Sequence, residues 1–123
     1  GVPINITQAC QWYLKAANLG CPDSQNTLGI LCQSGERIKK NDIKAHKWYL
    51  KAASQGNVPA QVNLALMYEH GGEGVKQNYT KAQQWYLNAA SQGNVNSQYK
   101  LGEFFENGNG VKQDHAKARE WYL

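Results

Sequence analysis

The 123-residue sequence lacks most features that point to a membrane protein, a disordered chain or a β-sheet protein. No run of about 18 apolar residues occurs, so we expect no membrane insertion. Charged residues make up 18% of the chain, too few for a disordered polypeptide. No segment alternates apolar and polar residues with period two, so we predict no strand. These absences favour a folded helical domain.

The charge balance also argues against a nucleic-acid partner. The net charge is +4, and the excess lies in residues 1–56, which hold seven Lys and Arg residues against three Asp and Glu residues. Residues 57–123 are neutral overall. A chain built to follow a phosphate backbone is expected to be basic more broadly. We therefore expect a local basic patch and no nucleic-acid binding.

The cysteines and histidines do not follow a metal-binding pattern. The cysteines are evenly spaced by 11 residues, and no two histidines are four residues apart; they are Cys10, Cys21, Cys32, His46, His70 and His115. We predict no metal site and no cofactor. A disulfide between Cys10 and Cys32 is one alternative, provided that both side chains face the seam between the two helices that flank Cys21. The other is two unpaired residues, with Cys32 in the core.

All four tryptophans recur at a nearly constant interval. Each opens a Trp-Tyr-Leu triplet, and they are separated by 36, 37 and 36 residues, at Trp12, Trp48, Trp85 and Trp121. An alanine precedes each Trp by three positions, and a leucine column follows the same period. A fixed period in this range is typical of a repeat array. We expect the Trp and Tyr side chains to fill the gaps between repeat units.

Glycine and asparagine mark where helices are expected to end and begin. Because glycine relieves the left-handed conformation just past a helix, each of six regularly spaced glycines should end one: Gly20, Gly35, Gly56, Gly71, Gly93 and Gly108. Recurring asparagines, and an aspartate in the same column, are suited to cap helix starts, at Asn5, Asn41, Asn57, Asn78, Asn94 and Asp114. The alternating spacing predicts seven helices, short and long in turn.

Two stretches share a longer pattern. Residues 48–77 and 85–114 carry Trp-Tyr-x-x-Ala-Ala-x-x-Gly-Asn, (Ala/Ser)-Gln-x-x-Leu-(Gly/Ala)-x-x-(Tyr/Phe)-x-x-Gly and Gly-Val-Lys-Gln, with Asn or Asp next. This pattern closely resembles Sel1-like repeats. The resemblance covers essentially the whole chain. It implies an all-α fold, a right-handed α-solenoid of antiparallel helix pairs related to tetratricopeptide arrays. It also implies an adaptor or scaffold in multiprotein assemblies, among them bacterial proteins used in host contact.

We expect one array over residues 1–123, with a partial unit at about 1–20, units at 21–56 and 57–93, and a truncated unit at 94–123. The first complete unit departs from the pattern, with Cys32 in an aromatic column and Cys21 in a cap column. Neither end shows the polar capping unit that a solenoid needs, nor does the start show a signal peptide. We expect a fragment of a longer array that is either monomeric or part of a longer solenoid. The sequence does not indicate the cellular compartment.

A partner is expected on the concave side, which the family resemblance assigns to the first helix of each pair. On those helices, three columns vary between units while the packing columns stay fixed: Thr27, Asn63 and Lys100; Ile30, Leu66 and Glu103; Ser34, His70 and Asn107. Fixed columns are needed for folding, and variable columns are free to encode recognition. The apolar Ile30 and Leu66, rimmed by polar residues, would suit a protein or peptide partner.

A stripe of four lysines forms a second candidate surface. Lys40, Lys44, Lys47 and Lys51 have helical spacing, and the same columns of the later units are less basic. One interpretation is a solvated helix face. The functional interpretation is contact with an acidic protein surface.

Two alternatives to a binding module remain. The cysteine-rich relatives of Sel1-like proteins suggest a penicillin-interacting or β-lactamase-like enzyme, and Ser97-Gln98-Tyr99-Lys100 matches the Ser-x-x-Lys motif of such enzymes. However, the cysteine pairs seven residues apart are missing, and neither Ser-Asp-Asn nor Lys-Thr-Gly occurs. We therefore predict no catalytic residue and no enzyme. The other alternative is a structural spacer in a longer protein.

Overall fold

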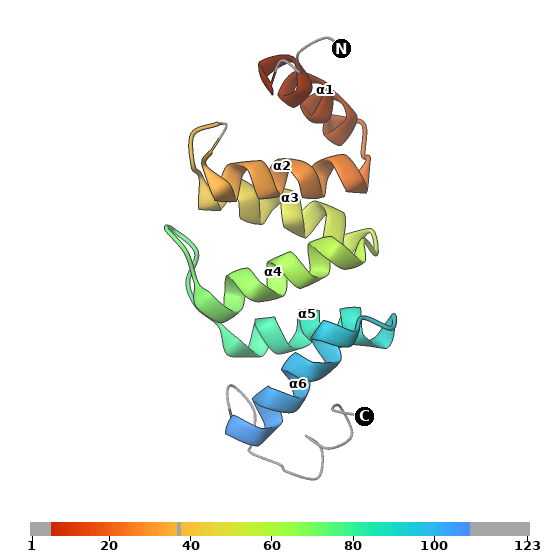
Figure 1. Ribbon diagram of the computed structural model, residues 1–123, viewed down its shortest axis with the longest axis vertical. Coiled ribbons are helices and arrows are strands. Elements are labelled where there is room, and N and C mark those ends of the chain that lie inside the picture. The colour runs from red at the N-terminus through yellow and green to blue at the C-terminus, as the bar shows by residue number, and fades with distance from the viewer. Residues whose placement is uncertain (1–5, 37, 109–123) are drawn as a thin grey trace.

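The computed structural model describes residues 6–36 and 38–108, which form six α-helices stacked in chain order along the long axis of the molecule (Figure 1). The helices are α1 (Ile6–Asn18), α2 (Pro22–Ser34), α3 (Asp42–Ser54), α4 (Val58–His70), α5 (Tyr79–Ser91) and α6 (Val95–Asn107). Within the described ranges there is no strand, only an isolated antiparallel bridge between Gly72 and Val75. The all-α prediction is confirmed. The seventh helix, expected near the C-terminus, lies outside these residues.

The helix ends within the described residues follow the predicted signals, and the expected caps at Asn5 and Asp114 lie outside them. Asn41 and Asn78 cap α3 and α5, and Asn57 and Asn94 cap α4 and α6, each through a side-chain oxygen that accepts a backbone N–H three residues later. All six predicted glycines have positive φ, between 68° and 98°. The expected alternation of short and long helices is wrong, since every described helix has 13 residues. The extra residues of the longer segments lie in the loops between α2 and α3 and between α4 and α5.

The core pairs small residues with large ones at recurring positions of the helices. Ala45, Ala52, Ala82 and Ala89 on α3 and α5 are fully buried, as are Leu64 on α4 and Leu101 on α6. Alanine has no side chain beyond Cβ, so it allows neighbouring helices to approach closely while leucine fills the remaining space. The repeated small and large columns are therefore the packing surfaces of the array.

The tyrosines are buried more deeply than the tryptophans beside them. Tyr49 and Tyr86 are 1% exposed, and Tyr86 packs edge-to-face on Phe104 at a centroid distance of 5.7 Å. Trp48 is only half-buried against the core, and Trp12 on α1 is 68% exposed. The expectation that the indole rings fill the gaps between units is therefore only partly right. The neighbouring tyrosines pack within and between units, since Tyr86 bonds to Glu69 of its own unit and meets Phe104 of the next.

A ladder of glutamine side chains joins successive units. Gln61 donates to the carbonyl of Ala53 in the preceding unit at 3.2 Å and accepts a 2.9 Å hydrogen bond from Gln92 of its own unit. One unit earlier, Gln25 donates to the Ala17 carbonyl and accepts a bond from Gln55. Gln25 and Gln61 are buried, so these bonds satisfy polar groups that would otherwise be unpaired in the core.

Candidate functional site

The nine residues predicted for the partner surface all lie outside the core. Three come from each of α2, α4 and α6, and all are exposed or half-buried: Thr27, Ile30, Ser34, Asn63, Leu66, His70, Lys100, Glu103 and Asn107. The opposite side of the same helices carries the buried leucine column. We call these nine residues the α2–α4–α6 face.

Two side-chain contacts tie the helices of this face to one another. Asn63 on α4 donates a 3.0 Å hydrogen bond to Oδ1 of Asn26 on α2. Lys100 on α6 donates to Oε2 of Glu69 on α4 at 3.3 Å. Three helices that are not consecutive in the chain therefore present their variable columns side by side. Ile30, which is 46% exposed, is the accessible apolar residue of the face, whereas Leu66 packs partly against the core.

Glu69 is the residue of this region that sequence analysis missed. Its carboxylate accepts a hydrogen bond from the Tyr86 hydroxyl at 2.7 Å and pairs with Lys100. The side chain is 14% exposed, and the His70 imidazole lies 4.0 Å from it. Burial, and then the bond to Glu69, raises the pKa of Tyr86. Glu69 could have been found from its position in the repeat, because Gln33 at the equivalent position of the preceding unit accepts a hydrogen bond from Tyr49.

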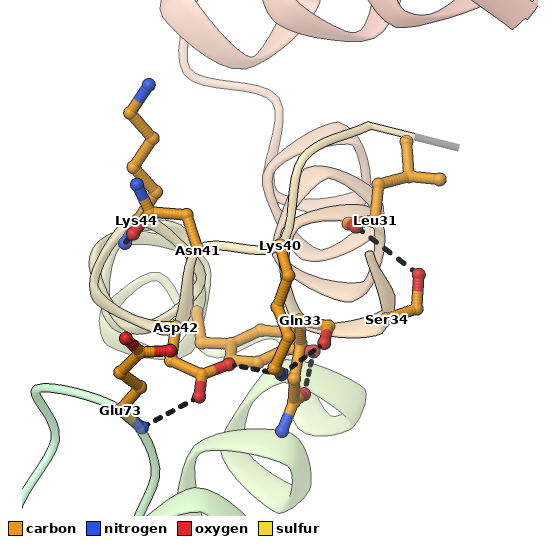
Figure 2. Close-up of polar contacts among 9 residues, drawn as sticks. Leu31, Gln33, Ser34, Lys40, Asn41, Asp42, Lys44 and Glu73 are labelled. Carbon is orange, nitrogen blue, oxygen red and sulfur yellow. Dashed lines mark hydrogen bonds and ion pairs between the residues drawn. The ribbon is translucent and has the colours of Figure 1, made fainter. Parts of the chain in front are cut away.

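The structure divides the four-lysine stripe into two parts. Lys40 lies in the loop before α3, where its ammonium group donates to the Gln33 carbonyl at 2.7 Å and pairs with Asp42 at 2.8 Å (Figure 2). Asp42 in turn accepts the backbone N–H of Glu73 in the following unit at 2.9 Å. The bond from Lys40 lowers the pKa of Asp42 against its burial, and the Glu73 N–H adds to the effect. Lys40 therefore belongs to an inter-unit contact.

The other three lysines of the stripe are exposed on α3. Figure 2 shows the Lys44 side chain directed away from the Lys40–Asp42 pair. The Lys51 ammonium lies over the Trp48 ring, 4.9 Å from its centroid. Lys44, Lys47 and Lys51 thus form the basic surface that remains free to meet an acidic partner.

A cavity of about 450 Å³ lies between α1 and α3, over α2. It is lined mainly by apolar side chains and thiols, with lysines beside them: Cys10, Gln11, Leu14, Leu28, Cys32, Ile38, Lys39, Asn41, Lys44 and Trp48. Both thiols are free, so this structure holds no bridge between Cys10 and Cys32. Burial raises the pKa of the Cys32 thiol. Sequence analysis singled out Cys32 as a departure from the repeat but did not predict the cavity.

The Ser-x-x-Lys motif has no accessible nucleophile. Ser97 is fully buried, and its hydroxyl has no hydrogen-bond partner. The Lys100 ammonium, one turn later on α6, is held by Glu69. A catalytic serine must reach its substrate and hand its proton to a base, and this arrangement provides neither.

Residues 6–36 and 38–108 contain neither a metal-binding cluster nor a membrane-spanning helix. In these ranges no three His, Cys, Asp or Glu residues are grouped so that they would hold a metal ion. No helix there is long and apolar enough to cross a membrane.

Comparison with known families agrees with the repeat pattern. The Sel1 repeat model matches residues 1–21, 22–57, 58–94 and 95–123. The chain belongs to the Sel1 repeat family. A comparison with curated proteins gave no significant match.

Solved structures of other Sel1 repeat proteins share this fold. A Sel1 repeat protein from Oxalobacter formigenes is 40% identical, with a TM-score of 0.92 over 99% of this chain. A protective antigen of uropathogenic Escherichia coli strains, which displays an SLR fold, is 35% identical, with a TM-score of 0.87 over 97% of this chain. The Helicobacter pylori cysteine-rich protein B is 26% identical, with a TM-score of 0.69; the match covers 94% of this chain and 81% of that one.

The present Sel1 repeat chain is shorter than the first two of these relatives. It spans 50% of the Oxalobacter protein and 24% of the Escherichia antigen. The predicted helical repeat solenoid is confirmed by these matches. The activity of a longer protein does not follow from them.

Proposed function

We propose that this Sel1 repeat chain is a non-enzymatic scaffold or adaptor module that binds a protein or peptide partner along the α2–α4–α6 face. The observation that carries the proposal is the separation of columns within each helix. On α2, α4 and α6 the repeated leucine column (Leu28, Leu64 and Leu101) is buried, whereas all nine variable residues remain accessible on the same three helices. A surface that folding does not constrain is free to encode recognition.

The chemistry of the face suits an extended or helical peptide. Ile30 offers an apolar contact near one end, and Lys100 and Glu103 offer charges of both signs near the other. Interfaces commonly combine an apolar centre with a polar rim. Since one relative is a protective antigen of a pathogenic bacterium, we include a host-contact or assembly role in the proposal.

A photo-crosslinking experiment tests the face against a matched control. Benzoylphenylalanine placed at Ile30, which is 46% exposed on α2, should yield a discrete crosslinked product in cells of the source organism. The same residue placed at Leu87, which is 40% exposed on α5, should not yield that product. Glu103→Lys should lower the yield of the crosslinked product without lowering the helicity of the protein. A product of equal yield from both positions, or one unaffected by Glu103→Lys, would contradict the assignment.

The enzyme alternative has its own test. A chromogenic cephalosporin should remain unhydrolysed, and penicillin should leave the mass of the protein unchanged, because Ser97 is buried beneath the surface of α6. A covalent mass shift that disappears in Ser97→Ala would instead establish a penicillin-interacting enzyme.

A further inference from the structure

The cavity between α1 and α3 occupies a repeat position that the next unit fills with its own side chains. Cys10 and Cys32 stand in the columns of His46 and Tyr68, each 36 residues earlier. Part of the remaining walls is shared. Ile38, Lys39, Asn41 and Lys44 around the first cavity correspond to Val75, Lys76, Asn78 and Lys81 around the second. The sites differ in the pair of side chains between the helices and in the rest of their walls, since Gln11, Leu14, Leu28 and Trp48 line only the first cavity and Ile43 and Gly74 only the second.

In the later unit, an aromatic ring occupies this space. The Tyr68 hydroxyl lies 2.6 Å from Nε2 of His46, and the two rings meet edge-to-face at 5.3 Å. The Lys81 ammonium lies over the Tyr68 ring, 5.4 Å from its centroid. A smaller cavity, of about 300 Å³, remains beside them. The phenol ring is thus bound on one side by an imidazole and covered on another by a cation.

In the earlier unit, the ring and its imidazole partner are both replaced by cysteines, while part of their surroundings is retained. Two short thiol side chains leave a cavity of about 450 Å³, large enough to hold a small ligand or a side chain. Lys44 lines this cavity in the column of Lys81, so the cation that covers an aromatic ring is retained. Leu28 and Trp48 supply apolar walls.

We propose that this cavity binds an aromatic side chain that an acidic segment of a partner protein inserts between α1 and α3. The ring would take the place that Tyr68 takes in the next unit, under the Lys44 ammonium. The positive charge around the cavity favours acidic residues on either side of the inserted ring. Among the residues that the structure describes, its lining includes Lys39 and Lys44 and no acidic residue, and the basic surface continues along α3 through Lys47 and Lys51.

A chain-borne ring explains this extended charge better than a small aromatic acid does. Lys47 and Lys51 do not line the cavity, and a single carboxylate on a buried ring would leave them without a role in binding. Acidic residues on either side of an anchor ring would meet them along α3. The proposal does not depend on the α2–α4–α6 face, because none of the nine residues of that face lines the cavity.

The test compares two peptides against the 123-residue chain by ¹H–¹⁵N NMR. The first is acetyl-Glu-Asp-Tyr-Asp-Glu-amide, and the second carries alanine in place of tyrosine. The tyrosine peptide should shift the amide signals of Cys10, Leu28 and Lys44 and bind about tenfold or more tightly than the alanine peptide, as expected for loss of an aromatic anchor. Equal affinities, or shifts confined to other surfaces, would overturn the proposal.

Two sets of variants locate the site. Lys44→Gln should weaken binding of the tyrosine peptide. Lys81→Gln makes the same change in the unit that already has its ring in place, and it should not weaken binding. Cys32→Tyr should fill the cavity and abolish binding while preserving the dispersed NMR spectrum. If Cys32→Tyr fails to fold, the two lysine variants decide, since both lysines are exposed. Equal effects of Lys44→Gln and Lys81→Gln would show only a general attraction between charges and overturn the site.

A third ligand distinguishes a ring carried by a protein from a free small aromatic acid. Free 4-hydroxyphenylacetate carries the same ring and one acidic group without a peptide. We expect it to bind about tenfold or more weakly than the tyrosine peptide, because it does not reach the lysines along α3. Equal binding would identify a pocket for small aromatic acids and overturn the assignment to a partner protein.

Discussion

The hydroxyl of Tyr86 donates a 2.7 Å hydrogen bond to the carboxylate of Glu69, joining α5 to α4. Tyr49 donates a bond of the same length to Gln33 and joins α3 to α2 in the same way. Both tyrosines are 1% exposed, so the hydroxyl depends on this acceptor in place of water. The repeat therefore requires an acceptor at this column, whether charged or neutral, and the charge itself is a separate feature of Glu69.

We predict that Glu69→Ala destabilises the protein more than Glu69→Gln does. The alanine variant leaves the buried Tyr86 hydroxyl without its acceptor, which costs about 1–3 kcal/mol. The glutamine variant retains an acceptor, as Gln33 shows, and loses only the ion pair with the half-buried Lys100. Urea unfolding followed by circular dichroism at 222 nm measures the difference. Equal losses would mean that the charge of Glu69, not its role as acceptor, stabilises the helix pair.

A second prediction concerns the N-terminus of α2, where Cys21 occupies the cap position. Its backbone angles, φ −71° and ψ 112°, nearly equal those of Asn57 and Asn94, whose side chains accept a backbone N–H. Cys21 makes no such side-chain cap bond. Cys21→Asn should therefore stabilise the protein by about 0.5–1 kcal/mol, because the backbone is already in the capping conformation.

The control for this prediction is the reverse exchange. Asn94→Cys should lower the thermal midpoint by an amount similar to the rise in Cys21→Asn, since the two caps have nearly the same geometry. No rise in Cys21→Asn, with a clear loss in Asn94→Cys, would show that α2 does not benefit from a cap.

The caps also show why so much of the fold was predictable from sequence. Asparagine at a helix start and glycine after a helix end act through local backbone geometry, so their positions along the chain are sufficient to predict the ends. The period of the tryptophans and leucines then indicates which helix faces pack together. The helix lengths were predicted wrongly because spacing alone does not divide a segment between loop and helix.

The details of the site were harder to predict from the sequence, because they depend on contacts between residues of different repeat columns. Nothing in the sequence indicates that Asp42 reaches the backbone of Glu73, 31 residues later. In the same way, the volume beside Cys32 depends on the Cys10 column of another helix. A repeat pattern compares residues within a column, whereas hydrogen bonds and cavities arise between columns.

A third prediction tests the close approach of α2 and α3. A Cβ atom added at Gly29 would lie 2.5 Å from Cδ1 and Cε1 of the Tyr49 ring. The ring is buried and held by its bond to Gln33, so it has little room to shift. Alanine gains about 1 kcal/mol in helix propensity over glycine, but overpacking costs about 1–3 kcal/mol. We expect Gly29→Ala to lower the urea midpoint.

A surface exchange on another helix separates packing from propensity. Gln84 is exposed in the middle of α5, so Gln84→Ala should leave the midpoint unchanged or raise it slightly. If Gly29→Ala also raised the midpoint, the Tyr49 ring would have to move, and the bond from Tyr49 to Gln33 would not be a fixed feature of the unit.

The last prediction concerns His46, the partner of Tyr68. Burial, and then the positive charge of Lys81, lowers the pKa of this imidazole below its ordinary value of 6.5. As the pH falls below about 6.5, the unfolded chain therefore takes up the proton before the folded chain does, and stability falls with it until the folded pKa is passed. Asp42 contributes a loss of stability only at lower pH, because its lowered pKa lies below the ordinary carboxyl value of about 4.

Thermal midpoints measured between pH 7.5 and 5 should decline in the parent protein and decline less in His46→Gln. The surface change Gln84→Ala supplies the comparison, since it leaves His46 in place and should retain the parent slope over this range. A parent slope that persists in His46→Gln would place the titrating group elsewhere in the protein.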